Sequence, residues 1–184
     1  MRLKVVLDSD GLIKLAKSGI LAQVIREWHC LVPQAVYEET VERGKQEAYP
    51  DAEEIERLVH GHVKPLRENE QAEAILVQAR ALGRGEQEAL HLFFNERADV
   101  IITDDRAFLA VLKRAGLPAL PPALALVELA RFGGIQLAEA ESALEMMKGL
   151  IRQEVYQLAR RDLEELRKRT KLKGAEMDEG ERQS

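Results

Sequence analysis

Two acidic residues, Glu86 and Asp105, each stand at the head of an apolar helical stripe. The apolar residues at i+3, i+4 and i+7 are Ala89, Leu90 and Phe93 after the first acid, and Phe108, Leu109 and Leu112 after the second. This spacing defines the buried face of a helix, so each carboxylate falls on the inward side. Burying a lone carboxylate is costly or forces it to take up a proton. We therefore expect a cation where the two acids converge.

Short apolar runs alternate with helical patterns along the chain. The runs cover residues 4–7, 30–32 and 100–102, and each is followed by a segment with helical spacing. Strands that alternate with helices in this way predict an α/β sandwich around a mainly parallel central sheet.

The composition changes after Gly133 and Gly134. Residues 135–170 carry apolar side chains at three- and four-residue steps and no further strand pattern, and residues 171–184 are polar and rich in Gly, Glu and Lys. We therefore expect a globular domain over residues 1–134, a helical C-terminal extension over 135–170 and a flexible tail over 171–184.

The bulk composition limits the class of protein. A chain of 184 residues, 46% hydrophobic and 32% charged, suits one compact domain. The single cysteine, the lack of a membrane-length apolar run and an N-terminus soon interrupted by charge favour a cytoplasmic protein. The net charge of −5 argues against a broad basic nucleic-acid surface. Carboxylates that bind a divalent metal would still present positive charge to a phosphate.

Two of the acids follow predicted strands. Asp8 ends the first apolar run, just before a helix for which Ser9 is a plausible N-cap, and Asp105 follows the run at 100–102. The carboxyl ends of parallel strands share one edge of a sheet, where ligands bind in open α/β folds. The alternative is that Asp8 or Asp10 only caps the helix. Thr103 is the predicted N-cap of the helix that follows the later strand.

A further acid comes from the helix that begins near Pro33. Glu38 and Glu39 lie on opposite flanks of its apolar side, so periodicity does not choose between them, and two solvated surface acids are the alternative reading. By the same criterion, Glu88 and Asp99 fall off the inward faces of their segments. We expect both of these acids to be solvated.

Four carboxylates in one crevice cannot all stay ionised without a cation. Two unit charges about 4 Å apart repel by about 4 kcal/mol at an effective dielectric near 20. Ligands made only of oxygen favour Mg²⁺ or Mn²⁺, and such ions activate water and neutralise charge on a phosphate. The chain has no glycine-rich phosphate loop at the first strand, no Gly-x-Ser-x-Gly nucleophile and no convincing acid–base set among its four histidines. The acids therefore predict metal-assisted phosphodiester hydrolysis.

Motifs around the four acids occur in a characteristic order. They are Val-Val-Leu-Asp-Ser, Val-Pro-x-x-Val-Tyr-Glu-Glu, Gly-x-Gly-Glu-x-Glu-Ala-Leu and Ile-Ile-Thr-Asp-Asp-Arg-x-Phe. Each motif is weak alone, but the four together, within roughly residues 1–131, resemble the PIN domain family of VapC-type toxins and RNA-processing nucleases. The resemblance implies a three-layer α/β/α sandwich and a Mg²⁺- or Mn²⁺-dependent endoribonuclease.

The resemblance also assigns roles by position. The catalytic, metal-binding acids are expected to be Asp8, Glu39, Glu86 and Asp105. Asp10 is either a further ligand or a cap. The residues expected to contact the substrate backbone are Thr103, Ser9, Arg84, Arg106 and Lys14.

The implied partners are an RNA substrate, a second copy in a homodimer and, if the protein is the toxin of a toxin–antitoxin pair, an antitoxin protein. The competing hypothesis is a catalytically degenerate PIN-like binding module that docks a protein partner or RNA through its C-terminal helices. A receiver-type signalling domain also clusters acids at strand ends. It would need a phosphorylatable aspartate on a central strand, and the strand at Val100 supplies no clear one.

Overall fold

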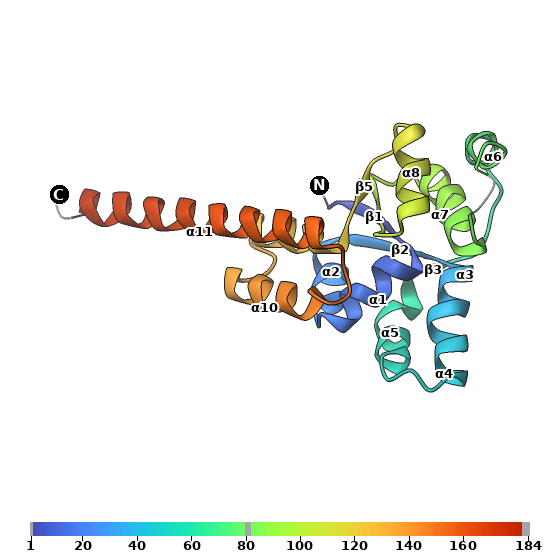
Figure 1. Ribbon diagram of the computed structural model, residues 1–184, viewed down its shortest axis with the longest axis horizontal. Helices are drawn as coiled ribbons and strands as arrows, with labels where there is room; N and C mark the ends of the chain where they lie inside the picture. Colours follow the sequence, from blue (N-terminus) through green and yellow to red (C-terminus); the bar gives the residue numbers. More distant parts are fainter. Residues whose placement is uncertain (1, 80–81, 182–184) are drawn as a thin grey trace.

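A parallel five-stranded sheet forms the centre of the molecule in the computed structural model, which describes residues 2–79 and 82–181 (Figure 1). All strand pairings are parallel, and the order across the sheet is β3-β2-β1-β4-β5. The strands are β1 (Lys4–Leu7), β2 (His29–Pro33), β3 (Val63–Lys64), β4 (Val100–Ile102) and β5 (Ala119–Leu120). The predicted α/β class is confirmed.

The strand order reverses direction between β1 and β4. The chain adds β2 and β3 on one side of β1 and then returns to add β4 and β5 on the other. Val6, at the middle of β1, pairs with Leu31 of β2 and Ile101 of β4, and all three are fully buried. Ligands of open α/β sheets bind at the carboxyl ends of the strands beside such a switch point. The residues that follow β1 and β4 therefore flank the expected site.

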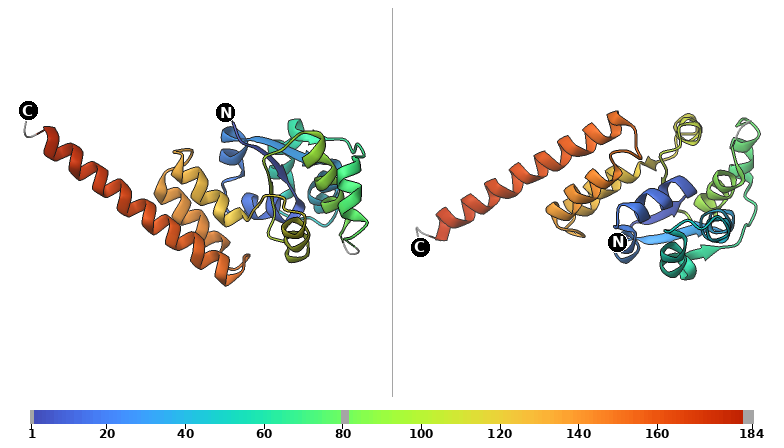
Figure 2. Two further views of the ribbon diagram at one scale, coloured as in Figure 1. Left: turned by 90° about the horizontal axis from the view of Figure 1, so that it is seen from above. Right: turned by 60° about the horizontal axis from the view of Figure 1, so that its bottom comes forward.

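Helices cover both faces of the sheet, as Figure 2 shows. One face packs on α1 (Ser9–Lys17), α2 (Leu21–Glu27), α5 (Ala52–Val59), α9 (Pro122–Arg131), α10 (Leu137–Met147) and α11 (Gln153–Glu181). The other face packs on α6 (Glu70–Leu76), α7 (Arg84–Asn95) and α8 (Arg106–Arg114). Alternate residues of β1 point into the two clusters, which explains why its run is apolar throughout. The three-layer α/β/α sandwich is confirmed.

One helical segment after β2 changes its winding along its length. It comprises α3 (Gln34–Tyr37), the π-helix η1 (Glu38–Arg43) and α4 (Gly44–Gln46). The short 3₁₀ helix η2 (His60–His62) precedes β3.

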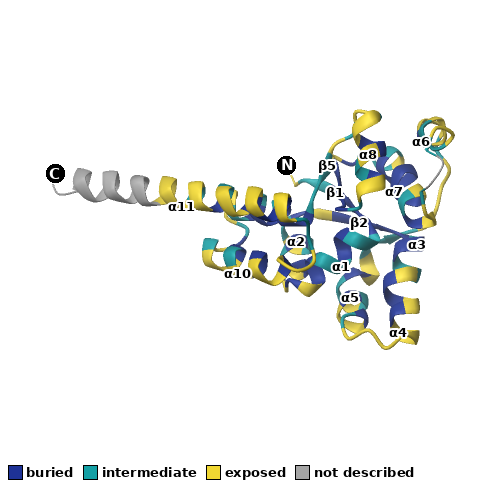
Figure 3. Cartoon of the chain, viewed as in Figure 1, coloured by how far each residue is buried: buried dark blue, intermediate teal, exposed yellow. Residues whose placement is uncertain are grey.

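The C-terminal helices pack onto the sandwich before α11 leaves it. Buried residues of α10 and the first turns of α11, such as Leu144, Tyr156 and Leu163, share one apolar cluster with β1 and β2. Further along, α11 extends away from the body, and most of residues 164–170 are exposed (Figures 1 and 3). Among the described residues, no helix has the length and apolar character needed to span a membrane.

The backbone of α11 is helical as far as Glu181, where a flexible tail from residue 171 was predicted. Continuing a formed helix fixes only one residue for each added hydrogen bond, and this stretch is rich in good helix formers such as Lys, Glu and Ala. The helix thus continues through residues 171–181, and the flexibility of this stretch stays a prediction. The last part of that prediction, residues 182–184, lies outside the described residues.

Candidate metal centre at the carboxyl edge of the sheet

Asp8 is the most buried of the four assigned acids. It follows β1, caps α1 by accepting a hydrogen bond from the Gly11 amide to Oδ1 at 2.6 Å, and is only 2% exposed. Burial raises the pKa of Asp8 to about 7, and the nearby charges of Asp10 and Glu86 add to the rise, although hydrogen bonds from Thr103 and Gly11 oppose it. The prediction that Ser9 is the N-cap was wrong, because α1 begins at Ser9 and Asp8 supplies the cap, as the alternative reading had it. This carboxylate carries its charge at neutral pH only with difficulty unless a cation compensates it.

A close approach between α1 and β4 brings the two strand ends together. A Cβ on Gly11 would lie 2.4 Å from the Ile102 carbonyl oxygen, so only glycine fits there. The Asp8 amide also donates to the same carbonyl at 3.3 Å. This contact places Asp8 beside the residues that follow β4.

Thr103 links Asp8 to Asp105. Its side chain is fully buried, hydrogen-bonds Asp8 and accepts a hydrogen bond from the Asp105 amide at 3.1 Å. Asp105 is the N-cap of α8, because its Oδ1 accepts from the Phe108 amide at 2.7 Å. The prediction that Thr103 caps this helix was wrong, since the helix begins at Arg106 and the adjacent acid takes the cap. Thr103 instead fixes two of the assigned acids relative to each other.

Glu39 reaches the same edge from η1, and Glu86 reaches it from α7. The Ser9 hydroxyl donates to Glu39 Oε2 at 2.6 Å. Gly85 packs against this pair, because a Cβ placed there would lie 3.4 Å from Ser9 Oγ and 3.6 Å from Glu39 Oε2. The next residue, Glu86, is close enough to Asp8 to raise its pKa. The structure therefore brings Asp8, Glu39 and Glu86 to one neighbourhood.

The adjacent glutamates Glu38 and Glu39 have different partners. Glu38 Oε2 accepts from Arg84 Nη1 at 2.6 Å, and its Oε1 accepts from Gln34 Nε2 at 3.2 Å. Glu39 makes only the hydrogen bond with Ser9 among the described residues. Both open a π-helix, a rare winding that often occurs at functional sites. The contacts favour Glu39 as the acid left for an external cation.

Glu88 lies in the interior of the protein, and the prediction that it is solvated was wrong. It is 3% exposed, and its two oxygens accept from the Ala35 amide at 2.8 Å and from Arg84 Nε at 3.0 Å. α3 packs against this flank of α7, which the spacing within α7 alone does not reveal. Asp99 is exposed as predicted and accepts a hydrogen bond from the Lys4 amide at 2.7 Å.

A second group of acids at this edge is neutralised by the chain itself. Lys14 Nζ lies 2.8 Å from Asp10 Oδ2 and 3.1 Å from Asp104 Oδ2. Arg152 Nη2 lies 2.9 Å from Asp104 Oδ1. Although burial lowers it, these hydrogen bonds and charges hold the pKa of Lys14 above its ordinary value. Lys14, expected to contact the substrate backbone, is therefore engaged by two carboxylates.

The ion pairs divide the acids of this edge into two sets. Those paired with a Lys or Arg are Glu38, Glu88, Asp10 and Asp104. Among the side chains that the structure describes, those of residues 2–79 and 82–170, the acids of this edge without an ion pair are Asp8, Glu39, Glu86 and Asp105. The unpaired set coincides with the four acids assigned by motif position.

The unpaired set suits a hard divalent cation in donor type and charge. Its donors are carboxylate oxygens, which Mg²⁺ and Mn²⁺ prefer, and a cation would relieve the cost of keeping Asp8 ionised. The acids surround the edge without meeting at one point. Within the described part of the chain, no three His, Cys, Asp or Glu side chains lie close enough to hold an ion. The four acids thus suit Mg²⁺ or Mn²⁺ in donor type and charge. In this structure, however, they lie farther apart than the ligands of one ion.

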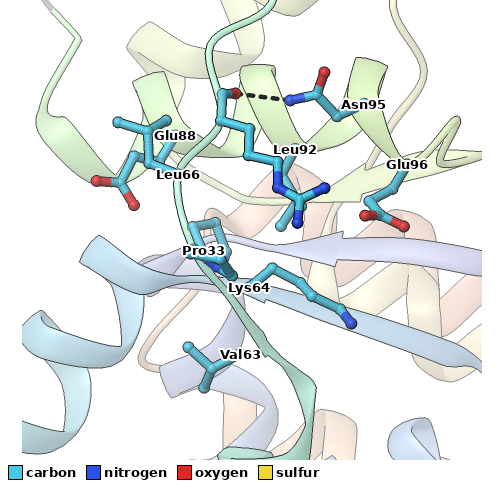
Figure 4. Close-up of a pocket in the computed structure, with 10 residues that line it drawn as sticks. Pro33, Val63, Lys64, Leu66, Glu88, Leu92, Asn95 and Glu96 are labelled. Carbon is cyan, nitrogen blue, oxygen red and sulfur yellow. Dashed lines mark hydrogen bonds between the residues drawn. The ribbon is translucent and has the colours of Figure 1, made fainter.

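A cleft of about 230 Å³ lies between β3 and α7 (Figure 4). Glu88 lies at one end of it and Glu96 at the other. Lys64 and Arg67 also line the cleft, and neither forms an ion pair with another residue that the structure describes. The cleft therefore carries two cations without an ion pair, but none of the four unpaired acids lines it.

The chain is thus a parallel α/β/α sandwich in which acids without an ion pair follow the strands beside the switch point. The chain belongs to the PIN domain family: the family model DUF3368, described as a PIN domain, matches residues 4–169. PIN domains are generally nucleases, so this is a nuclease-type fold of the hydrolase class. The match also covers the C-terminal helices as far as residue 169. A search of curated proteins found no match.

Proposed function

We propose that the protein is a Mg²⁺- or Mn²⁺-dependent endoribonuclease that hydrolyses RNA phosphodiesters at the carboxyl edge of its sheet. The observation that carries the proposal is the coincidence between the acids without an ion pair and the acids assigned by motif. Asp8, Glu39, Glu86 and Asp105 would hold the ion. When bound, such an ion lowers the pKa of a water molecule and neutralises charge on the phosphate.

The chain's own residues set up this chemistry. Thr103 holds Asp8 and Asp105 in a fixed relation, and Ser9 orients Glu39. The N-termini of α1 and α8, which follow β1 and β4, lie at the same edge, and helix N-termini favour phosphate. Arg106 is exposed and makes no ion pair within the described chain, so it is the best placed of the suggested backbone contacts. Arg84 is also exposed, although Glu38 and Glu88 engage it.

Asp105→Asn should lower the rate of RNA cleavage roughly 100-fold while the protein stays folded, because the amide can still cap α8 but cannot neutralise a cation. The measurement is the single-turnover cleavage rate of an RNA pool with Mn²⁺ and, separately, with a chelator. Asp162→Asn on α11 is the control and should cleave like the wild type. An unchanged rate for Asp105→Asn, or cleavage that survives chelation, would reject the proposal.

The two adjacent glutamates should behave differently. Glu39→Gln should lower cleavage at least about tenfold, because it removes an unpaired carboxylate from the site. Glu38→Gln should stay within about threefold of the wild type, because Glu38 already pairs with Arg84. The same cleavage assay compares the two variants. They make the same chemical change, from a carboxylate to an amide, at adjacent positions. Equal losses would show that the ion pairs do not select the ligand.

The toxin role, an antitoxin partner and a homodimer stay predictions. The competing hypothesis, a degenerate module that docks partners through its C-terminal helices, draws support from the open spacing of the acids and from the extended α11. Calorimetric titration with Mn²⁺ separates the two, because a degenerate site should bind no metal at millimolar concentration.

A further inference from the structure

The side chain of Arg152, a residue of the C-terminal helical region, places a positive charge at the carboxyl edge of the sheet. It lies in the turn between α10 and α11, and its Nη2 contacts Asp104 Oδ1 at 2.9 Å. The Asp104 side chain is only 2% exposed, whereas that of Arg152 is 32% exposed. Lys14 contacts the other Asp104 oxygen at 3.1 Å. Each oxygen of this buried carboxylate therefore has its own cation, one of them contributed by a segment far along the chain.

Asp104 is the middle residue of the turn that carries the site. Thr103, before it, hydrogen-bonds Asp8, and Asp105, after it, is an assigned ligand. The Asp104 amide also donates to Asp10 Oδ2 at 3.1 Å. A buried carboxylate left with one cation is less well held in place and has reason to move toward water. That movement would displace both neighbours, because the turn from Thr103 to Asp105 is not part of a helix or strand.

We propose that Arg152 is a positioning residue through which the C-terminal helices hold the turn from Thr103 to Asp105, so that Asp8 and Asp105 are placed to share one divalent ion. The inference rests on the proposed metal-dependent function and deepens it. Arg152 acts through Asp104 and contacts neither ion nor RNA. The C-terminal helices are then part of the metal centre.

The guanidinium of Arg152 does not use all of its hydrogen-bond donors within the described part of the chain. Its Nε is buried and has no hydrogen-bond partner among the described residues, a situation that costs stability. The contact with Asp104 is kept despite that cost. This favours a role in the site over a role only in joining two helices to the sandwich.

The test is calorimetric titration of the full chain with Mn²⁺. Arg152→Gln should bind Mn²⁺ about tenfold more weakly than the wild type, as expected when a residue that orients a ligand is lost. The same variant should lower kcat for RNA cleavage about tenfold. Its KM should stay within about twofold of the wild-type value, because Arg152 does not contact the RNA. The matched control is Arg160→Gln, which removes an exposed ion pair with Glu164 on the same helix. The control should match the wild type in all three measurements.

A double-mutant comparison asks whether Arg152 acts through Asp104. Asp104→Asn alone should also weaken Mn²⁺ binding about tenfold, and Asp104→Asn with Arg152→Gln should be no weaker than the weaker single variant. If Arg152→Gln does not fold, judged by circular dichroism, Asp104→Asn carries the test, because the amide keeps the shape of the side chain.

Wild-type affinity in Arg152→Gln or in Asp104→Asn would overturn the inference and leave the proposed function standing. Additive losses in the double variant would equally overturn it. Failure of the unaltered protein to bind Mn²⁺ would overturn the proposed function, and the inference with it.

Discussion

Asp8→Asn is expected to make the metal-free protein more stable at pH 8 and to lower RNA cleavage by about a thousandfold. Asp8 is buried, and no cation within the described residues pairs with it, so its charge opposes folding. Asparagine keeps an oxygen that can accept from the Gly11 amide but carries no charge. The same substitution removes the carboxylate that we place at the centre of the metal site. Stability and activity should therefore change in opposite directions.

The pKa of Asp8 determines whether its charge raises or lowers the free energy of unfolding at a given pH. The pKa of Asp8 is about 7 in the folded protein against an ordinary 3.8, so between these values the folded state holds a proton that the unfolded state has lost. The free energy of unfolding should therefore fall as pH rises from about 4 to about 7 and level off above. The full effect is up to about 4 kcal/mol. Asp8→Asn should lack this component.

Urea unfolding at pH 5, 6 and 8 with a chelator present measures the effect. The curve for Asp8→Asn should separate from that of the wild type as pH rises, whereas Asp162→Asn should follow the wild type. Adding Mn²⁺ should stabilise the wild type more at pH 8 than at pH 5, since the ion competes with the proton, and should leave Asp8→Asn unchanged. Parallel pH curves for the wild type and Asp8→Asn would contradict the assignment.

The strands, and the acids that follow two of them, could be predicted from local patterns. The apolar runs, their alternation with helices and the placement of Asp8 and Asp105 after β1 and β4 could all be read from spacing, because a parallel sheet buried on both faces requires such runs. The approach of Glu86 to Asp8 was also expected, and the charge of Glu86 adds to the burial that raises the pKa of Asp8.

The partners of the acids could not be predicted in the same way. Helical periodicity tells which side of a helix faces inward, but it does not tell what packs against the flank. Glu88 was placed in solvent, yet α3 covers it. The pairing of Arg152 with Asp104 joins residues 48 positions apart, and no local pattern reports it.

Glu38 and Glu39 also show that a local sequence pattern does not predict the partner of an acid. The two are adjacent and chemically identical, so only the contacts of Arg84 and Ser9 separate them. The fate of each carboxylate at this edge depends on which cation the fold brings to it. A sequence motif can mark the acids, but tertiary contacts decide which remain available for a metal ion.

Glu88→Ala should lower the free energy of unfolding by about 3 kcal/mol. The substitution leaves the Ala35 amide at the start of α3 without its acceptor, and it releases the Arg84 Nε contact. A lost acceptor inside the protein costs more than a lost surface ion pair, so the backbone hydrogen bond should account for most of the effect. Urea unfolding at pH 7 measures it.

Two control variants isolate the cause. Glu88→Gln keeps an oxygen for the Ala35 amide and should lose only about 1 kcal/mol, and Glu165→Ala, at an exposed position of α11, should lose less than about 0.5 kcal/mol. Because α3 leads directly into η1, its displacement in Glu88→Ala should also move Glu39 and weaken Mn²⁺ binding. Equal stability of Glu88→Ala and Glu88→Gln would mean that the buried hydrogen bond does not hold α3 in place.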